Sequence, residues 1–255
     1  MEKTRMGNRR EAVLDLCRHL VKIPSLSGQE RQIIGFLRDY YANHGFTSLF
    51  VDEYGSLTVS SQGNREGPVL LFDGHVDTVP APDPDAWDYP PFDAVIDKGR
   101  LYGRGSSDMK GAVAAMAVAA TEFLRQSGGE FKGQLILAAV VQEEVFEGVA
   151  ARSISERYRP DLVVIGEATS LNLAIGQRGR AEIKLEAFGT PAHSANPEKG
   201  ENVVYLMADL IRALSDLEPP THPVLGSGIL ELTDIKSSPY PGASVVPSYC
   251  AATYD

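Results

Sequence analysis

Cysteine is scarce in this chain of 255 residues, which has only Cys17 and Cys250 and no Cys-x-x-Cys pair. Two cysteines are too few for the disulfide framework of a small secreted protein, and they cannot form a zinc site made of thiolates. Chains of this kind are typical of reducing compartments, so we expect a cytoplasmic protein. Cys17 falls on the apolar face of an expected helix, and we interpret it as a core residue.

Long apolar runs and an excess of positive charge are also absent. No run reaches the length of about 18 residues that a membrane span needs. The basic start, MEKTRMGNRR, is followed by an amphipathic pattern and not by the apolar region of a signal peptide. The 24 Lys and Arg are outnumbered by 34 Asp and Glu, which gives a formal net charge of -10. Because nucleic acids are bound by clustered basic side chains, we expect neither a nucleic acid nor a membrane as partner.

Apolar periodicity predicts two helices at the start of the chain. Residues 8–23 carry apolar side chains at helical spacing, and the segment closes before a proline. A second helix is expected over residues 27–45. Ser27 followed by Glu30 matches a capping box, in which the two side chains satisfy the first backbone amides of the helix.

Continuous apolar runs predict the strands of the first domain. The runs PVLLF, LILAAVV and LVVIG are apolar throughout, as expected for strands covered on both faces. A helix rich in small residues, GAVAAMAVAATEFL, follows Asp108. Strands that alternate with helices indicate an α/β domain with a parallel or mostly parallel sheet.

The pattern changes after residue 179. RAEIKLEAF and GILELTDI alternate, NVVYLMADLIRAL is an amphipathic helix, and SVVPSYCAATYD indicates a further strand. This β-α-β-β order is two elements short of a ferredoxin-like unit. We therefore expect one domain over residues 1–179 and a second, truncated one over residues 180–255.

Five acidic or imidazole side chains stand where apolar runs end or where a strand turns into a helix. They are His75, Asp108, Glu143, Glu144 and Glu167. In open α/β sheets the carboxyl ends of neighbouring strands share one edge, so these side chains can converge although they are far apart in sequence. Imidazole and carboxylate ligands without thiolate suit Zn²⁺, and Co²⁺ or Mn²⁺ fit the same set.

Each of these residues also has a plain structural interpretation. Asp108 is a candidate helix N-cap, and Glu143, Glu144 and Glu167 are candidates for exposed acidic turns. The GRG before Asp108 invites a phosphate-loop interpretation, but the Gly-x-Gly-x-x-Gly pattern is incomplete and an acid stands where an anion would bind. The joint occurrence of the five favours a metal site.

Six motifs resemble one family of zinc-dependent amidohydrolases. The motifs are GHVDTVP at 74–80, GRGSSDMKGA at 103–112, QEE at 142–144, GEAT at 166–169, GQRGR at 176–180 and GTPAHSANPEKGEN at 189–202. They occur in the order found in acetylornithine deacetylase, succinyl-diaminopimelate desuccinylase, aminoacylase and bacterial glutamate carboxypeptidase. The wording of QEE and GQRGR is similar to a subgroup of hydrolases linked to selenium metabolism. The resemblance implies a zinc-peptidase-like catalytic domain and a lid domain.

The resemblance implies a site with two metal ions. His75 and Glu167 would bind one ion, Glu144 the other, and the carboxylate of Asp108 would bridge both. Asp77 lies two residues after His75, so in an extended segment both side chains point to the same side. Its carboxylate would accept a hydrogen bond from the imidazole.

The resemblance also implies roles for residues outside the ligand set. Glu143 would be the general base, and His193 would stabilise the oxyanion, often across a dimer formed by the lids. Arg178 and Asn202 would contact the substrate, with an Arg suited to a free carboxylate. Taken without the motifs, His193 is better explained as a solvated loop histidine and Arg178 as an ordinary surface charge.

One feature of the family has no counterpart in the sequence. The family supplies a further histidine to the second metal from near its C-terminus, and His222, His19 and His44 do not match that position. We therefore expect the catalytic domain to lack its C-terminal part here, and an incomplete second metal site leaves open whether these 255 residues are active by themselves. The family further implies a cis peptide bond between Asp108 and Met109.

The expected activity is hydrolysis of the amide bond of a small N-acyl amino acid or a dipeptide-like substrate with a free carboxylate. The alternative is a homologue that binds metal without catalysis and acts as a binding or regulatory module. A pure metal binder would need Glu144 but no base beside it, so Glu143 favours the enzyme. A serine hydrolase is not indicated, because the sequence has no Gly-x-Ser-x-Gly motif.

Overall fold

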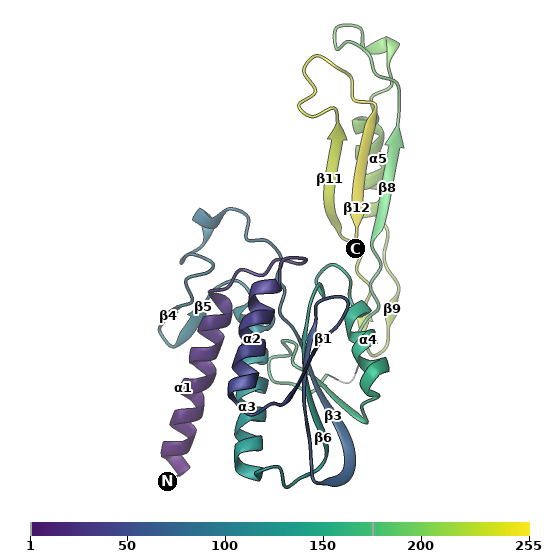
Figure 1. The fold of residues 1–255 in the computed structure, drawn as a ribbon. Coiled ribbons are helices and arrows are strands. Elements are labelled where there is room, and N and C mark those ends of the chain that lie inside the picture. The colour runs from purple at the N-terminus through teal and green to yellow at the C-terminus, as the bar shows by residue number, and fades with distance from the viewer. Residues whose placement is uncertain (1, 175) are drawn as a thin grey trace. The chain divides into compact units, whose positions relative to one another are not determined.

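The computed structural model describes residues 2–174 and 176–255, and for residues 2–8 it describes the backbone alone. The chain divides into two compact units, Met1–Leu171 and Asn172–Asp255. Figure 1 shows the elements of each unit.

The first unit is built on a sheet of five strands in the order β1-β2-β6-β3-β7. Strand β3 lies between β6 and β7 and runs parallel to both, whereas β1–β2 and β2–β6 are antiparallel pairs. The expected α/β fold is thus confirmed, with a mixed sheet in which two strand pairs are parallel and two are antiparallel. Its strands are β1 (Ser48–Val51), β2 (Leu57–Gln62), β3 (Arg65–His75), β6 (Lys132–Val140) and β7 (Leu162–Ile165).

Helices cover both faces of this sheet, and strand β6 shows how the core is divided (Figure 1). Its residues Leu135 and Leu137 pack with α1, α2 and α3, while Ile136 and Ala138 pack with α4 on the opposite face. This alternation follows from the period of two along a strand. The helices are α1 (Glu2–Val21), α2 (Arg31–Asn43), α3 (Gly111–Ser127) and α4 (Val149–Tyr158).

Short elements connect the main ones on the side of the strands' carboxyl ends. After β3 the chain forms a 3-10 turn, η1 (Pro84–Ala86), and a small hairpin of β4 (Val95–Asp97) and β5 (Arg100–Tyr102). A kinked turn, η2 (Ser106–Lys110), in which Asp108 and Met109 have non-helical backbone angles, then leads into α3. The core position expected for Cys17 is confirmed, since 5% of it is exposed.

The apolar run before Glu167 does not form a strand covered on both faces. The four apolar residues of β7, Leu162–Ile165, are between 43% and 62% exposed. The expectation of a strand covered on both faces is wrong here: in the part of the chain that the structure describes, β7 is the outer strand of the sheet and pairs with β3 alone, so fewer neighbouring elements cover it. A continuous apolar run indicates a surface that can be covered, not one that is covered.

The second unit is a three-stranded antiparallel sheet with one helix against it. The strand order is β11-β12-β8, and α5 packs Val203 and Met207 against Ala187, Cys250 and Ala252. The expected β-α-β-β order is present, with an additional hairpin of two-residue strands. The elements are β8 (Ile183–Phe188), η3 (Pro197–Lys199), α5 (Val203–Ser215), β9 (Thr221–His222), β10 (Gly226–Ser227), β11 (Leu232–Ser238) and β12 (Tyr249–Tyr254).

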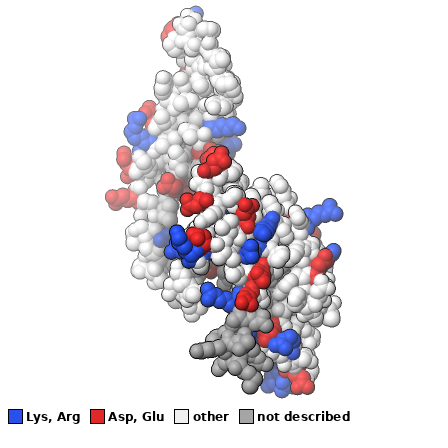
Figure 2. Space-filling view, turned by 90° about the vertical axis from the view of Figure 1, so that its left-hand side faces the viewer, with Lys and Arg blue, Asp and Glu red and all other residues white. Residues whose placement is uncertain are grey.

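Among the described residues, no helix combines the length and apolar character needed to cross a membrane. Figure 2 shows Lys and Arg interspersed with Asp and Glu on the face turned to the viewer, and the described residues there form no continuous basic patch.

Candidate metal centre

Residues far apart in sequence meet at the carboxyl ends of β3 and β7. His75 is the last residue of β3, and pairing sets it opposite Val140 of β6 and sets Asp73 opposite Ile165 of β7. Nε2 of His75 lies 2.9 Å from Oδ1 of Asp108 and 3.5 Å from Oε1 of Glu167. The ligand atoms of His75, Asp108 and Glu167 all lie within 4.8 Å of one another.

Two glycines let α3 approach the strand ends that carry these ligands. A Cβ at Gly74, directly before His75, would lie 2.9 Å from the methyl carbons of Met109 and Met116. A Cβ at Gly166, directly before Glu167, would lie 2.9 Å from Cβ of Ala112. The Gly-His and Gly-Glu pairs of the sequence are therefore explained by close packing of the helix on the sheet edge.

The turn η2 brings Asp108 over the same edge. The peptide bond between Asp108 and Met109 is cis, as the resemblance implies. Met109 is buried beside β3, and its sulfur accepts a hydrogen bond of 3.2 Å from the backbone amide of His75. The side chain of Asp108 is 60% exposed, whereas that of His75 is 2% exposed.

Asp77 is fully buried, and its carboxylate connects its own loop, which follows β3, to the loop after β6. Its Oδ1 accepts a hydrogen bond of 3.1 Å from the amide of Glu143, and its Oδ2 accepts one of 3.1 Å from the amide of Glu144. Nδ1 of His75 is 3.1 Å from the backbone oxygen of Asp77 and 3.5 Å from Oδ1. These oxygen acceptors would hold the ring proton on Nδ1 when Nε2 binds a metal ion.

The side chains of Glu143 and Glu144 are electrostatically coupled to this group. Burial raises the pKa of Glu144, and the charge of Asp108 adds to the increase. Burial likewise raises the pKa of Glu143 to about 7; the charge of His75 opposes this increase, and the charges of Glu167, Glu147 and Glu144 add to it. Among the described residues, the compact ligand group contains His75, Asp108 and Glu167 without Glu144.

The remaining ionisable groups respond to the same crowding of negative charge. Burial also raises the pKa of Glu167, with a further contribution from Asp108. For His75 burial acts to lower the pKa, but hydrogen bonds to Asp77 and Asp108, together with nearby carboxylates, raise it to about 10. Burial raises the pKa of Asp73 to about 6.

The donor set fits a metal ion. Several carboxylates with raised pKa values surround one buried imidazole, and a cation would relieve their mutual repulsion. The available atoms are imidazole nitrogen and carboxylate oxygen, which suits Zn²⁺, Co²⁺ or Mn²⁺. The geometry therefore agrees with a metal centre at the carboxyl ends of β3 and β7.

Three of the site residues expected from the sequence belong to the second unit. Arg178 donates from Nε and Nη2 to the backbone oxygen of Leu225, at 3.1 and 2.7 Å. Asn202 is the N-cap of α5 and accepts a hydrogen bond from the amide of Val204. Nδ1 of His193 accepts a hydrogen bond from the amide of Ala195. These contacts all lie within the second unit.

The capping box expected at Ser27 and Glu30 is absent, and this corrects the sequence analysis. Helix α2 begins at Arg31, and no side chain caps its first turn. The Ser27 hydroxyl donates instead to Oδ2 of Asp77 at 2.7 Å. Oε1 of Glu30 accepts a hydrogen bond of 2.9 Å from the amide of Gln142. The Ser-x-x-Glu pattern is present in the sequence, but Ser27 and Glu30 form hydrogen bonds with Asp77 and Gln142, which lie on other loops.

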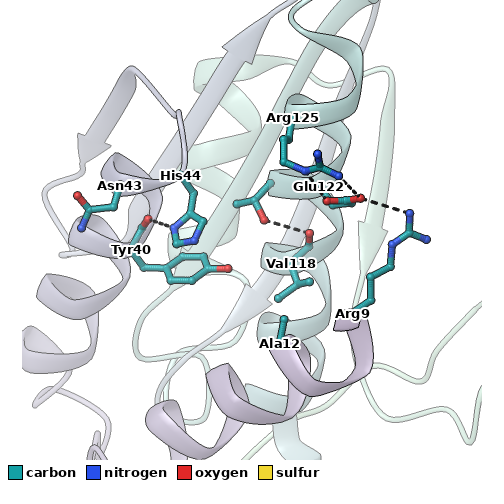
Figure 3. Close-up of a pocket in the computed structure, with 9 residues that line it drawn as sticks. Arg9, Ala12, Tyr40, Asn43, His44, Val118, Glu122 and Arg125 are labelled. Atoms are coloured by element: carbon teal, nitrogen blue, oxygen red, sulfur yellow. Dashed lines mark hydrogen bonds and ion pairs between the residues drawn. The ribbon is translucent and has the colours of Figure 1, made fainter. Parts of the chain in front are cut away.

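A separate cavity lies on the helical face of the first unit. It has a volume of about 550 Å³ and is lined by side chains of α1, α2 and α3 (Figure 3). Glu122 lies between Arg125 and Arg9, and hydrogen bonds from Arg125 and Gln126 lower its pKa to about 2. None of the candidate metal ligands lines this cavity.

Fold and site together define an α/β protein whose ligand cluster lies at the carboxyl ends of parallel strands. The sequence profile of peptidase family M20/M25/M40 matches residues 71–238, and the chain belongs to this family. It is 32% identical over 254 residues to succinyl-diaminopimelate desuccinylase 2 of Ruegeria sp. (strain TM1040). That match covers 94% of this chain and 63% of the relative. The chain thus spans about three fifths of the length of curated relatives that it matches.

Solved structures share the fold at low sequence identity. The dipeptidase Dug1p of Saccharomyces cerevisiae superposes with a TM-score of 0.70 at 15% identity, covering 98% of this chain and 70% of the other. The Bacillus subtilis YxeP protein, described as a dinuclear metal binding peptidase of the M20 family, superposes with a TM-score of 0.56 at 16% identity. That match covers 97% of this chain and 64% of the other.

Proposed function

We propose that this chain carries the active site of a metal-dependent hydrolase that cleaves the amide bond of a small N-acyl amino acid or a dipeptide-like substrate. The observation that supports this most is the group of His75, Asp108 and Glu167 next to a glutamate, Glu143, whose pKa is raised to about 7. The desuccinylase and dipeptidase relatives hydrolyse amide bonds of this kind, which agrees with the proposal.

The proposed ligands are divided between two metal ions. His75 and Glu167 would hold one ion and Glu144 the other, with the carboxylate of Asp108 shared between them. Zn²⁺ is proposed, and Co²⁺ or Mn²⁺ would suit the same atoms. Bound metal supplies a Lewis acid and lowers the pKa of water, so that hydroxide is available near neutral pH.

The chain's own acid and base would be Glu143. Its carboxylate accepts a proton from the attacking water as the C–O bond forms, and it returns that proton to the nitrogen as the C–N bond breaks. A base with a pKa near the working pH performs both transfers. Asp77 would keep the imidazole of His75 in the tautomer that leaves Nε2 free to bind metal.

The second unit would supply contacts to the substrate. We propose that it acts as a lid and dimerisation domain, and that the first unit is the catalytic domain. His193 would stabilise the developing oxyanion, across a homodimer formed by the lids. Arg178 would bind a free carboxylate through two parallel N–H groups, and Asn202 would contact the substrate as well.

A panel of substrates tests the proposal. The full-length protein, loaded with Zn²⁺, is assayed against N-succinyl and N-acetyl amino acids and against dipeptides, with free amine as the readout. Turnover that is lost on chelation and restored by Zn²⁺ is expected. Stoichiometric metal binding with no turnover on the whole panel would favour the non-catalytic binding module.

A further inference from the structure

The connector between α1 and α2, residues 22–30, contacts the loop that follows β3. The Ser25 hydroxyl donates to the backbone oxygen of Val76 at 2.7 Å, and the amide of Thr78 donates to the backbone oxygen of Ser25 at 2.9 Å. The Ser27 hydroxyl donates to Oδ2 of Asp77 at 2.7 Å. Ser25 and Asp77 are fully buried, so these hydrogen bonds are shielded from water.

The same connector contacts the loop that carries the proposed base. Oε1 of Glu30 accepts hydrogen bonds from the amides of Gly28, at 3.0 Å, and Gln142, at 2.9 Å. Gln142 has a φ of 57°, in the left-handed region that residues other than glycine rarely adopt. This conformation leads into the two amides, those of Glu143 and Glu144, that donate to Asp77.

Glu30 is an unusual residue for a connector. It is 5% exposed, and no ion pair involves it in the part of the chain that the structure describes. A buried carboxylate without a cation is costly unless hydrogen bonds compensate it. The hydrogen bonds that its carboxylate accepts from the amides of Gly28 and Gln142 provide this compensation, and Gln142 directly precedes Glu143 and Glu144.

Lys110 connects the turn that carries Asp108, η2, to the C-terminal end of α1. It lies two residues after Asp108, is fully buried, and donates from Nζ to the backbone oxygens of Leu20, at 3.1 Å, and Ile23, at 2.9 Å. An ammonium group is favourable at a helix C-terminus, where carbonyl oxygens lack partners within the helix. The turn that carries Asp108 is therefore attached to the beginning of the connector.

We propose that the connector is a brace for the metal centre, and that Ser27, Glu30 and Lys110 are positioning residues. Each acts on a different loop: Ser27 on that of His75 and Asp77, Glu30 on that of Glu143, and Lys110 on that of Asp108. Because these loops come from three separate strand ends, β-sheet pairing alone does not fix their side chains to one another. The inference rests on the proposed function, since it concerns the same site.

Glu30→Ala tests the brace, with Glu30→Gln as the conservative partner and the exposed Glu11→Ala as the matched control. Both hydrogen bonds use one oxygen of Glu30, and glutamine keeps such an oxygen. In the metal-free full chain, hydrogen–deuterium exchange at Gln142–Glu144 should rise at least about tenfold in Glu30→Ala. Affinity for Co²⁺, followed by its visible absorption, should fall by about 10–100-fold. Glu30→Gln should recover most of both losses.

Ser27→Ala provides a second, milder test, because it deletes a single hydroxyl and serves even if Glu30→Ala does not fold. We expect about a tenfold loss of Co²⁺ affinity with no change in Glu11→Ala. Unchanged exchange and unchanged Co²⁺ affinity in folded Glu30→Ala, or unchanged Co²⁺ affinity in Ser27→Ala, would overturn the brace. Exchange and Co²⁺ binding need no turnover, so a lack of amidase activity in the natural chain would count against the proposed function and not against the brace.

Discussion

At the scale of single residues, the two ring nitrogens of His75 face different partners. Nδ1 faces the oxygens of Asp77, and Nε2 faces Asp108 and Glu167. The sequence predicted this pair from its spacing, since residues two apart in an extended segment share a side. It did not predict that the backbone oxygen of Asp77 is nearer than its carboxylate, because that depends on the turn after the strand.

Glu143 carries the first prediction. Glu143→Gln in the full-length protein should leave zinc content nearly intact, because Glu143 is the proposed base and is not one of the proposed metal ligands. The value of kcat should fall by about 10²–10⁴-fold, the usual effect of removing a positioned acid or base. Metal analysis and steady-state kinetics on one preparation check both. Activity close to that of the natural chain would remove Glu143 from its proposed role.

The pH dependence of stability follows from the same residue. In the metal-free chain the pKa of Glu143 is raised from 4.5 to about 7, so folding takes up a proton between these values. The stabilisation is complete below pH 4.5 and is lost as the pH rises toward about 7. Relative to Glu143→Gln, the natural chain should therefore lose thermal stability across this window. Melting curves at a series of pH values measure it, and a constant difference would contradict the assignment.

At the scale of elements, sequence patterns predicted the structure correctly where it depends on local contacts, and incorrectly where it depends on contacts with other parts of the fold. The alternation of residues 180–188 and 228–235, on either side of an amphipathic helix and followed by a further strand, was sufficient to predict the second unit's β-α-β-β order. The pattern of Ser27 and Glu30 was correct for a capping box, but the partners came from other loops, which local sequence does not reveal. Likewise β7 is apolar but lies at the sheet edge, and edge position is a property of the assembled sheet.

Glycine substitutions test the contact between α3 and the sheet edge. Gly166→Ala places a Cβ 2.9 Å from Ala112 and from the end of Met109, and the resulting overpacking should cost about 1–3 kcal/mol. Gly35→Ala in α2 meets no atom within 4 Å and should stabilise the helix by up to about 1 kcal/mol. Urea unfolding of both variants gives the two signs. Equal effects would show that α3 does not pack tightly on the strand before Glu167.

At the scale of the whole molecule, each unit leaves apolar strand surface exposed. Leu162–Ile165 form an edge in the first unit, and Ile183 and Phe188 of the edge strand β8 are 50% and 71% exposed in the second. Open apolar edges are sites where further chain or another molecule can pair. The motifs were sufficient to predict the family. They do not predict what pairs with these edges, because that depends on the assembled sheets.

The edge of β8 carries the last prediction, that the full chain is a dimer formed through its second unit. Among the described residues, strand β8 pairs with β12 on one side only, and a two-fold axis beside its other side would bring two identical edges together. Ile183→Lys puts a charge on this edge and should yield monomers by light scattering, whereas Val51→Lys on the first unit should not. If His193 acts across the dimer, the Ile183→Lys monomer should keep its metal content and lose most of its kcat. A natural chain that is monomeric and active would contradict both statements.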